Sequence, residues 1–139
     1  MRILSVDYGR KRIGLAITDP GHIIAQPLEV VSQPGVNRIK DIVKEFNVGK
    51  IVVGLPLNMD GTPGKDTPDV RNFVLKLTEN LKDAHCEIEL FDERLTTRQA
   101  ERALIEANVS RKKRKEKIDR ISACVLLESY LDYIKTKAK

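Results

Sequence analysis

The chain opens with short apolar runs separated by turn signals, a pattern that predicts three strands in succession. The runs are rich in β-branched residues and cover residues 2–7, 13–18 and 23–31. Gly9 lies in the first turn and Asp19-Pro20-Gly21 forms the second. Pro27 indicates an edge strand or a bulge, because proline cannot donate a ladder hydrogen bond. Short turns between successive strands predict an antiparallel meander.

Beyond residue 35, helical and strand-like patterns alternate. Apolar residues at helical spacing predict helices over residues 36–46, from 67–69 to 81, over 97–107 and over about 116–135. Short apolar runs predict strands over residues 50–53 and 87–91. The order βββαβαβαα predicts an α/β protein with a mixed five-stranded sheet flanked by helices. Three strands form the antiparallel meander, and two are parallel strands reached by crossovers.

Composition fits one compact domain over residues 1–139, with 41% hydrophobic and 32% charged residues. No apolar run approaches the ~20 residues of a membrane span, and no signal-peptide pattern precedes the first strand. We therefore expect a cytoplasmic protein that does not bind membranes. Cys86 and Cys124 stand alone without a CxxC motif, which argues against a disulfide framework or a zinc site.

The net charge of +5 is concentrated in one segment. Ser110–Arg120 reads SRKKRKEKIDR, with seven basic and two acidic residues, and the rest of the chain is neutral. Such a basic segment predicts a polyanionic partner, with nucleic acid favoured over an anionic membrane. The alternative is a basic face that is merely solvated.

Three of the predicted strands end at positions suited to a shared site. The first ends on Asp7, the fourth at Gly54, and the fifth on the pair Asp92 and Glu93. If these strands are neighbours, their ends share one edge, where α/β sheets bind ligands. The loop over residues 54–69 holds three glycines and three prolines, and loops of this length are often functional.

A third acid comes from the last predicted helix. In a helical projection, Asp119 falls within about 60° of Ala123, Leu126 and Tyr130. A carboxylate on an apolar face is costly unless it is paired or bound to metal. The small Ala123 would let this helix approach the sheet closely. The alternative is an aspartate that only complements the helix dipole.

Three acids that meet on one side of the sheet repel one another unless a divalent cation neutralises them. Carboxylate oxygens suit Mg²⁺ or Mn²⁺. Two such ions about 4 Å apart can activate water and stabilise the leaving oxygen in phosphodiester hydrolysis. His22 and His85 are too few and too scattered for a zinc enzyme.

Four segments together resemble the YqgF/RuvX family. They are DYGRKRIGLA from Asp7, VGLPLNMDG from Val53, DERLTT from Asp92 and KIDRISACVLLESYL from Lys117. This family belongs to the ribonuclease H-like superfamily and is related to the RuvC Holliday-junction resolvases. The resemblance covers the chain nearly end to end, in order and without a large insertion.

The resemblance implies a single ribonuclease H-like nuclease domain acting in the cytoplasm. The family is described both as processing the 5′ end of the 16S rRNA precursor and as resolving Holliday junctions. Motif by motif, it implies that Asp7, Glu93 and Asp119 are the catalytic, metal-binding acids, with Asp92 as the substitute for Glu93. Many relatives have Ala-Ala where this chain has Ala123-Cys124.

Basic residues are predicted to hold the nucleic-acid backbone, which would make binding salt-dependent. They are Arg10, Lys11, Arg12, Lys65, Arg94, Arg111, Lys112, Lys113, Arg114 and Lys115. Aromatic residues make up only 4% and there is no Trp, so recognition of shape is favoured over base stacking. Asn58, Asp60 and Thr62 either orient the bound strand or simply close the edge of the sheet.

Several alternatives stay open from the sequence. The substrate is an rRNA precursor, with the small ribosomal subunit as a further partner, or branched DNA. Junction resolution would need two active sites and therefore a homodimer, whereas rRNA processing is compatible with a monomer. A non-catalytic nucleic-acid-binding factor would keep the fold and the basic segment. Asp7-Tyr8-Gly9 also resembles a phosphate loop of sugar kinases and actin, but those folds need two such domains.

Overall fold

The computed structural model describes residues 1–95 and 111–137, and of residues 111–120 it describes the backbone alone. The described strands are β1 Arg2–Tyr8, β2 Arg12–Thr18, β3 Ala25–Ser32, β4 Val48–Leu55 and β5 Glu87–Asp92. The described helices are α1 Val36–Glu45, α2 Thr67–Asn80 and α4 Arg111–Lys137, with a single 3₁₀ turn, η1 Glu93–Leu95.

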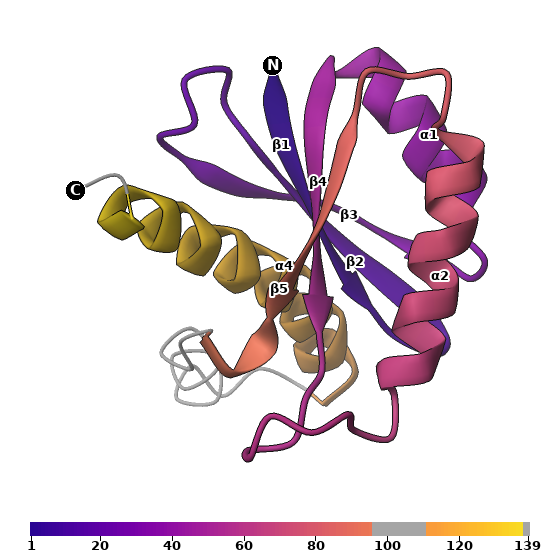
Figure 1. Ribbon diagram of the computed structural model, residues 1–139, viewed down its shortest axis with the longest axis vertical. Coiled ribbons are helices and arrows are strands. Elements are labelled where there is room, and N and C mark those ends of the chain that lie inside the picture. Colours follow the sequence, from indigo (N-terminus) through magenta and orange to yellow (C-terminus); the bar gives the residue numbers. More distant parts are fainter. Residues whose placement is uncertain (96–110, 138–139) are drawn as a thin grey trace.

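The five strands form one mixed sheet in the order β3-β2-β1-β4-β5 (Figure 1). Strands β1, β2 and β3 pair antiparallel, and β4 joins β1 and β5 through parallel pairing. The predicted meander and the two crossover strands are therefore confirmed. Pro27 lies on the edge strand β3 beside a shift in the pairing register, so both features that it indicated are present.

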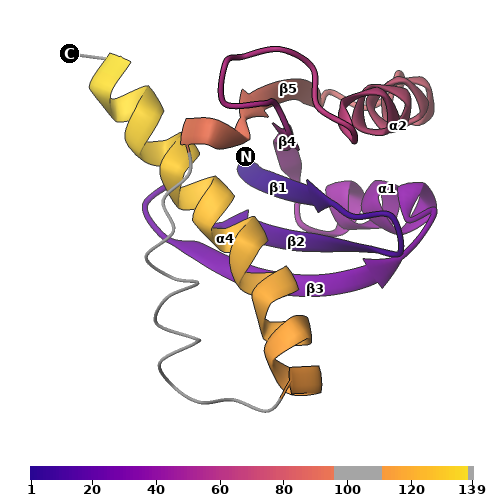
Figure 2. The ribbon, with the colours of Figure 1, turned by 90° about the horizontal axis from the view of Figure 1, so that it is seen from below.

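Helices cover the two faces of the sheet. Figure 2 shows α4 on one face and α1 and α2 on the other. The face under α1 and α2 carries the larger apolar cluster, which includes Leu4, Val6 and Ile51. The face under α4 is packed by Ile3, Val52 and further residues of the sheet, together with Ala123, Leu126, Leu127, Tyr130 and Leu131. Since β1 and β4 are buried on both faces, they need the near-continuous apolar sequences that they have.

Helix α4 lies close to the central strand. The Ser5 hydroxyl of β1 donates a hydrogen bond of 2.7 Å to the main-chain carbonyl of Ala123, which is fully buried. A larger residue at position 123 would hold the helix away from the sheet. The close approach predicted from Ala123 is confirmed, and so is the burial of Leu126 and Tyr130.

Several element boundaries differ from the prediction, most of all in α4 and β4, and β3 begins at Ala25 rather than at residue 23. Helix α4 begins at Arg111 rather than near residue 116, so the basic segment forms its first turns. Lysine and arginine are good helix formers, and their propensity extends the helix where no apolar stripe marks it. Strand β4 is longer than the predicted 50–53, because Val48 already pairs with Arg2 and Leu55 pairs with Asp92. The helix predicted over 97–107 lies outside the described residues.

No helix within residues 1–95 and 111–137 combines the length and the apolar character needed to cross a bilayer.

Candidate functional site

Asp7 lies one residue before the end of the central strand β1, and its side chain is on the face that α4 covers. Side chains alternate between the two faces of a strand. Ile3 packs in the cluster beneath α4, and Ser5 bonds the backbone of that helix. Asp7 follows with the same alternation, and its side chain is half-buried.

Glu93 occupies the corresponding place after β5. Its side chain packs against Gly54 of β4, and Val52, two residues earlier on β4, lies in the cluster beneath α4. Because β4 separates β1 from β5, Asp7 and Glu93 lie on either side of β4 at the same end of the sheet. The prediction that these strand ends share one edge is confirmed.

Asp92 and Glu93 have opposite environments although they are neighbours. The Arg94 guanidinium binds the Asp92 carboxylate, with Nη2 donating to Oδ2 at 2.6 Å and Nε at 2.9 Å. The Arg94 amide donates to Oδ1 at 2.9 Å. These bonds lower the pKa of Asp92, above all the side-chain bond to Arg94. Asp92 therefore has its counter-ion within the chain.

Glu93 is a carboxyl group in surroundings that disfavour its charge. Burial raises the pKa of Glu93, and the negative charges of Asp66 and Asp92 raise it further. A bound cation would offset both effects, since it favours the ionised form. Of the two neighbouring acids, Glu93 is the one suited to hold a cation.

Asp66 joins this edge of the sheet from the start of α2. It is the residue before the first turn of that helix, and Arg10 in the β1–β2 turn binds its carboxylate at 2.9 Å. Arg10 also lies 3.9 Å from Asp69. Both partners are exposed, so the pair contributes little stability. Its effect is to link the basic turn beside Asp7 to the start of α2.

The loop between β4 and α2 has a defined shape near these acids. Asn58 and Thr62 hold its turn through backbone and side-chain hydrogen bonds, and Asp60 accepts two hydrogen bonds from Thr62. Arg94 fastens the loop to the end of β5, because its Nη1 donates to the Met59 carbonyl at 3.2 Å. The structure thus gives Asn58, Asp60 and Thr62 a role in shaping the loop.

The Arg94→Gln variant is expected to loosen the loop over residues 56–66. Loss of the bond to Met59 should speed amide exchange there by up to about tenfold, the factor that corresponds to one hydrogen bond of about 1.4 kcal/mol. The pKa of Asp92 should rise toward its ordinary value. Hydrogen exchange with mass spectrometry checks the first effect, and Arg71→Gln on exposed α2 surface is the control. Equal exchange in the two variants would contradict the bracing role.

Comparison with known proteins identifies the family. A family model described as "RuvX: Holliday junction resolvase" matches residues 1–133. The chain belongs to the RuvX family. A "Putative pre-16S rRNA nuclease" of Thermoanaerobacter pseudethanolicus is 48% identical over 143 residues, covering 99% of this chain and 100% of the relative. A protein of the same name from Syntrophomonas wolfei is 43% identical, covering 95% and 94%.

Solved structures support the fold of this RuvX chain. RuvC of T. thermophilus, in complex with a Holliday junction substrate, aligns with a TM-score of 0.59 over 96% of both chains. The sequence identity is 14%, so the likeness is one of fold. The ribonuclease H-like, RuvC-like architecture expected from the sequence is confirmed.

Asp119 of the RuvX chain lies in α4, four residues before Ala123. Its side chain is outside the described part, so its proximity to Asp7 and Glu93 stays a prediction. Among the side chains that the structure describes, no group of three histidine, cysteine, aspartate or glutamate residues is placed to hold a metal ion. Two of the three expected acids, Asp7 and Glu93, thus lie at one edge of the sheet. The position of the Asp119 side chain is not described.

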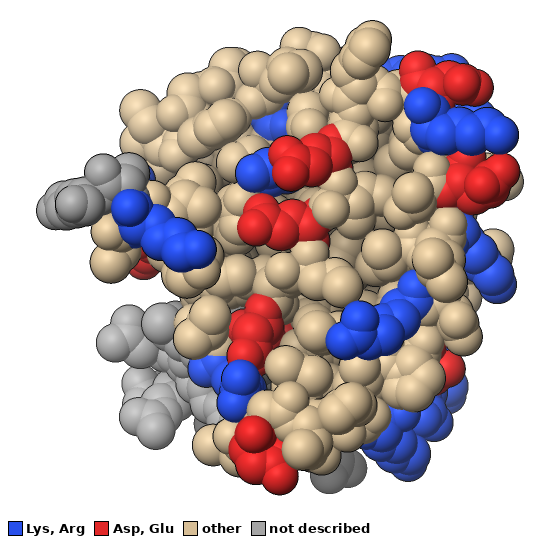
Figure 3. All heavy atoms as spheres, viewed as in Figure 1, with Lys and Arg blue, Asp and Glu red and all other residues tan. Residues whose placement is uncertain are grey.

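The predicted phosphate-binding residues of the RuvX chain fall into separate groups. Lys11 and Lys65 are exposed near the edge that bears Asp7, whereas Arg10 and Arg94 are bound by carboxylates. Arg12 is half-buried at the start of β2. Positions 111–115 lie in α4, where the structure leaves the side chains undescribed. Figure 3 shows acidic side chains along the middle of the face that it presents. On the neighbouring strands β4 and β5, Lys50 lies 3.8 Å from the carboxylate of Glu87 and 3.6 Å from that of Glu89.

Sequence reasoning missed Asp66, whose charge acts on Glu93 across the loop. A signal was present, because an aspartate just before Thr67-Pro68 is typical of the start of a helix. That signal indicated only a cap. It gave no indication that the start of α2 would lie beside the end of β5.

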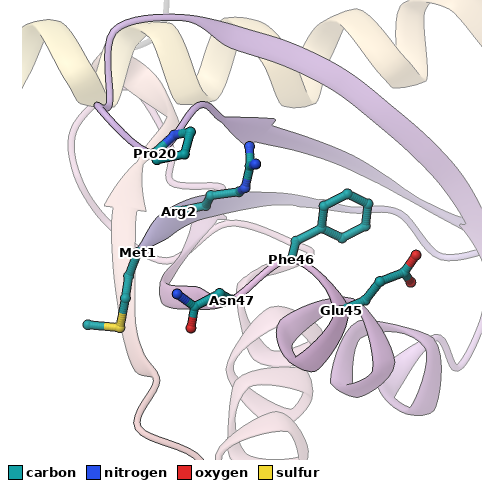
Figure 4. Close-up of a pocket in the computed structure, with 6 residues that line it drawn as sticks. All are labelled: Met1, Arg2, Pro20, Glu45, Phe46 and Asn47. Carbon is teal, nitrogen blue, oxygen red and sulfur yellow. The ribbon is translucent and has the colours of Figure 1, made fainter.

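A pocket of about 300 Å³ lies at the opposite end of β1 from Asp7 (Figure 4). Arg2 at its rim donates to the Thr18 carbonyl at 3.2 Å, and the Arg2 amide donates to the Asn47 carbonyl. The other lining residues are Met1, Pro20, Glu45 and Phe46. Because this pocket is remote from the acids, the candidate site is assigned to the edge with Asp7 and Glu93.

Proposed function

We propose that this chain is a metal-dependent endonuclease that hydrolyses phosphodiester bonds in structured nucleic acid. The observation that carries the proposal is the placement of Asp7 and Glu93 at one end of the sheet, on either side of β4, in a RuvX-family chain. The raised pKa of Glu93 supports it, because a half-buried carboxyl beside two other acids favours a cation.

Asp7, Glu93 and Asp119 would hold Mg²⁺ or Mn²⁺, since all three offer the oxygen ligands that these ions prefer. Such ions, when bound, lower the pKa of water and stabilise the leaving oxygen of the phosphodiester. The protein's part is to hold Asp7 and Glu93 on one face at the same end of the sheet. Lys11, Lys65 and the basic residues at 111–115 would hold flanking phosphates.

We further propose that the substrate is the 5′ end of the 16S rRNA precursor. The names of the curated relatives, which match over nearly the full length of both chains, support this choice. The scarcity of aromatic residues fits recognition of backbone and shape rather than of stacked bases. In this role the protein is cytoplasmic, meets its substrate on the small ribosomal subunit, and can act as a monomer.

Resolution of Holliday junctions is the second candidate. The description of the family model favours it, as does the fold shared with RuvC bound to a junction. A junction has two strands to cut symmetrically, so this function predicts a homodimer with two sites. The same acids and the same ions would serve either substrate.

The test is a cleavage assay with a labelled 16S rRNA precursor fragment and a four-way DNA junction. Each is incubated with protein and Mg²⁺, Mn²⁺ or EDTA, at several salt concentrations. We expect cleavage of the RNA that requires the metal and weakens as salt increases. Asp7→Asn protein purified in the same way excludes a contaminating nuclease.

The outcomes separate the candidates. Cleavage of the junction alone would favour the resolvase. Binding of either substrate without cleavage under any metal, equal in both proteins, would favour a non-catalytic binding factor and would contradict the nuclease.

A further inference from the structure

Gly54 occupies the position on β4 between the two located acids. The register pairs Val53 with Val6 on β1 and Gly54 with Phe91 on β5. One further step along β1 reaches Asp7, and two further steps along the chain from Phe91 reach Glu93. Gly54 also faces α4, as Val52 does.

The space beside Gly54 is filled by the Glu93 side chain. A Cβ added to Gly54 would lie 2.6 Å from Oε1 and 3.0 Å from Cγ of Glu93. Contacts under 3.0 Å are essentially never made by real Cβ atoms. The Glu93 carboxylate therefore occupies room that exists only because position 54 has no side chain.

Backbone conformation does not explain this glycine. Gly54 has none of the positive φ values that favour glycine at Gly35 and Gly61. It lies within a strand that is hydrogen-bonded on both sides, where glycine is unfavourable relative to alanine. The close approach of another group is the reason that remains, and that group is Glu93.

We propose that Gly54 is a positioning residue that keeps the Glu93 carboxylate on the face and edge of the sheet where Asp7 lies. The effect of Gly54 on catalysis rests on the proposed function. The effect of Gly54 on the position of Glu93 can be tested whether or not the protein is a nuclease. Any larger residue at position 54 would move the carboxylate away from Asp7 and from an ion held between them.

A methyl group at position 54 should displace Glu93 without harming the fold. The three atoms nearest to it belong to the flexible Glu93 side chain. Alanine is also the better strand residue. Gly54→Ala is therefore expected to combine unchanged or higher thermal stability with loss of metal binding.

Gly49→Ala is the matched control. Gly49 lies on the same strand at the opposite end, and the three atoms nearest to its added Cβ belong to the Met1 side chain, with Cβ at 2.7 Å and Sδ at 2.8 Å. Both variants thus add one methyl group to β4 against a single side chain. Only Gly54→Ala acts on Glu93.

The experiment measures Mn²⁺ affinity by calorimetry, melting temperature, and cleavage of the rRNA fragment. For Gly54→Ala we expect Mn²⁺ affinity and cleavage about 10- to 100-fold below wild type, the range found when residues that orient metal ligands are lost. Gly49→Ala should match wild type in both. Wild-type Mn²⁺ affinity in Gly54→Ala would overturn the inference.

A crystal structure of metal-free Gly54→Ala separates the inference from the proposed function. The Glu93 carboxylate should have left the position beside residue 54 that it occupies in the wild type. If no variant cleaves, the nuclease proposal fails, but the position of the Glu93 side chain still tests Gly54. A Glu93 carboxylate in its wild-type position in Gly54→Ala would overturn the positioning role.

Discussion

Glu93→Gln is expected to reduce metal-dependent cleavage at least about 100-fold, whereas Asp92→Asn should reduce it less than about tenfold. Loss of a residue that only orients a metal ligand costs about 10- to 100-fold, so loss of the ligand itself should cost at least the upper value. Asp92 is bound to Arg94, and its replacement should act through the loop alone.

The environments of Glu93 and Asp92 also predict how cleavage and stability depend on pH. A carboxyl whose pKa is raised keeps its proton to higher pH, so the ionised fraction of Glu93 increases with pH across that raised range. Without metal, folding is favoured by the protonated form, and the contribution of Glu93 to stability falls as pH rises through its folded pKa. Glu93→Gln should therefore raise the melting temperature of the metal-free protein at neutral pH.

Single-turnover cleavage rates from about pH 5 to 9 and melting curves check both statements. The contribution of Asp92 to stability depends on pH in the opposite direction. Its folded pKa is lowered, so its stabilisation is lost as pH falls through that pKa. If Asp92→Asn lost activity as severely as Glu93→Gln, the assignment of the metal ligand would be wrong. A lower melting temperature in Glu93→Gln would show that Glu93 has a structural role.

Leu127→Ala is expected to lower the free energy of unfolding by about 2–5 kcal/mol. Leu127 is fully buried between α4 and the sheet, in the cluster with Val52 and Phe91. This range includes the free energy of burying the removed atoms, which is lost, and the cost of the cavity that is left behind. Because this cluster fixes α4, the same change should weaken any function that depends on the helix.

Urea unfolding measures this effect. The control is Leu75→Ala on the outer face of α2, where the leucine is 69% exposed and the change should stay within about 0.5 kcal/mol. A slope of free energy against urea that equals the wild-type slope would show that the shift in midpoint is a change in stability. A loss under 1 kcal/mol for Leu127→Ala would contradict close packing of α4 on the sheet.

The order of the described strands and helices could be predicted because each pattern had one favoured structure. β-Branched runs bounded by glycine and proline have few options besides strands, and Pro27 marked the outer strand. The shared edge followed from topology, because parallel neighbouring strands place their carboxyl ends together. Asp7 and Glu93 were therefore predictable as a pair from the ends of their strands.

What could not be predicted depended on side-chain placement across the fold. Asp92 and Glu93 are both carboxylic acids, and the sequence does not tell which of them binds a cation. The bonds of Arg94 to Asp92 and the burial of Glu93 distinguish the two acids in the structure. The beginning of α4 was missed because its first turns carry charge rather than an apolar stripe, and local propensity alone extends them. Asp66 was missed because the loop, which has no periodicity, sets its place near Glu93.

The hydrogen bond between Ser5 and Ala123 also sets a distance scale for the site. Asp7 is two residues along β1 from Ser5, about 7 Å of strand. Asp119 is four residues along α4 from Ala123, about 6 Å of helix, and α4 begins at the end of the sheet toward which β1 runs (Figure 1). The contact between Ser5 and Ala123 thus fixes how far Asp7 and the backbone of Asp119 lie from one shared point. The predicted proximity of Asp119 to Asp7 requires this placement of α4, because a slip of the helix by one turn would move Asp119 by about 5.4 Å along its axis with no change in either acid.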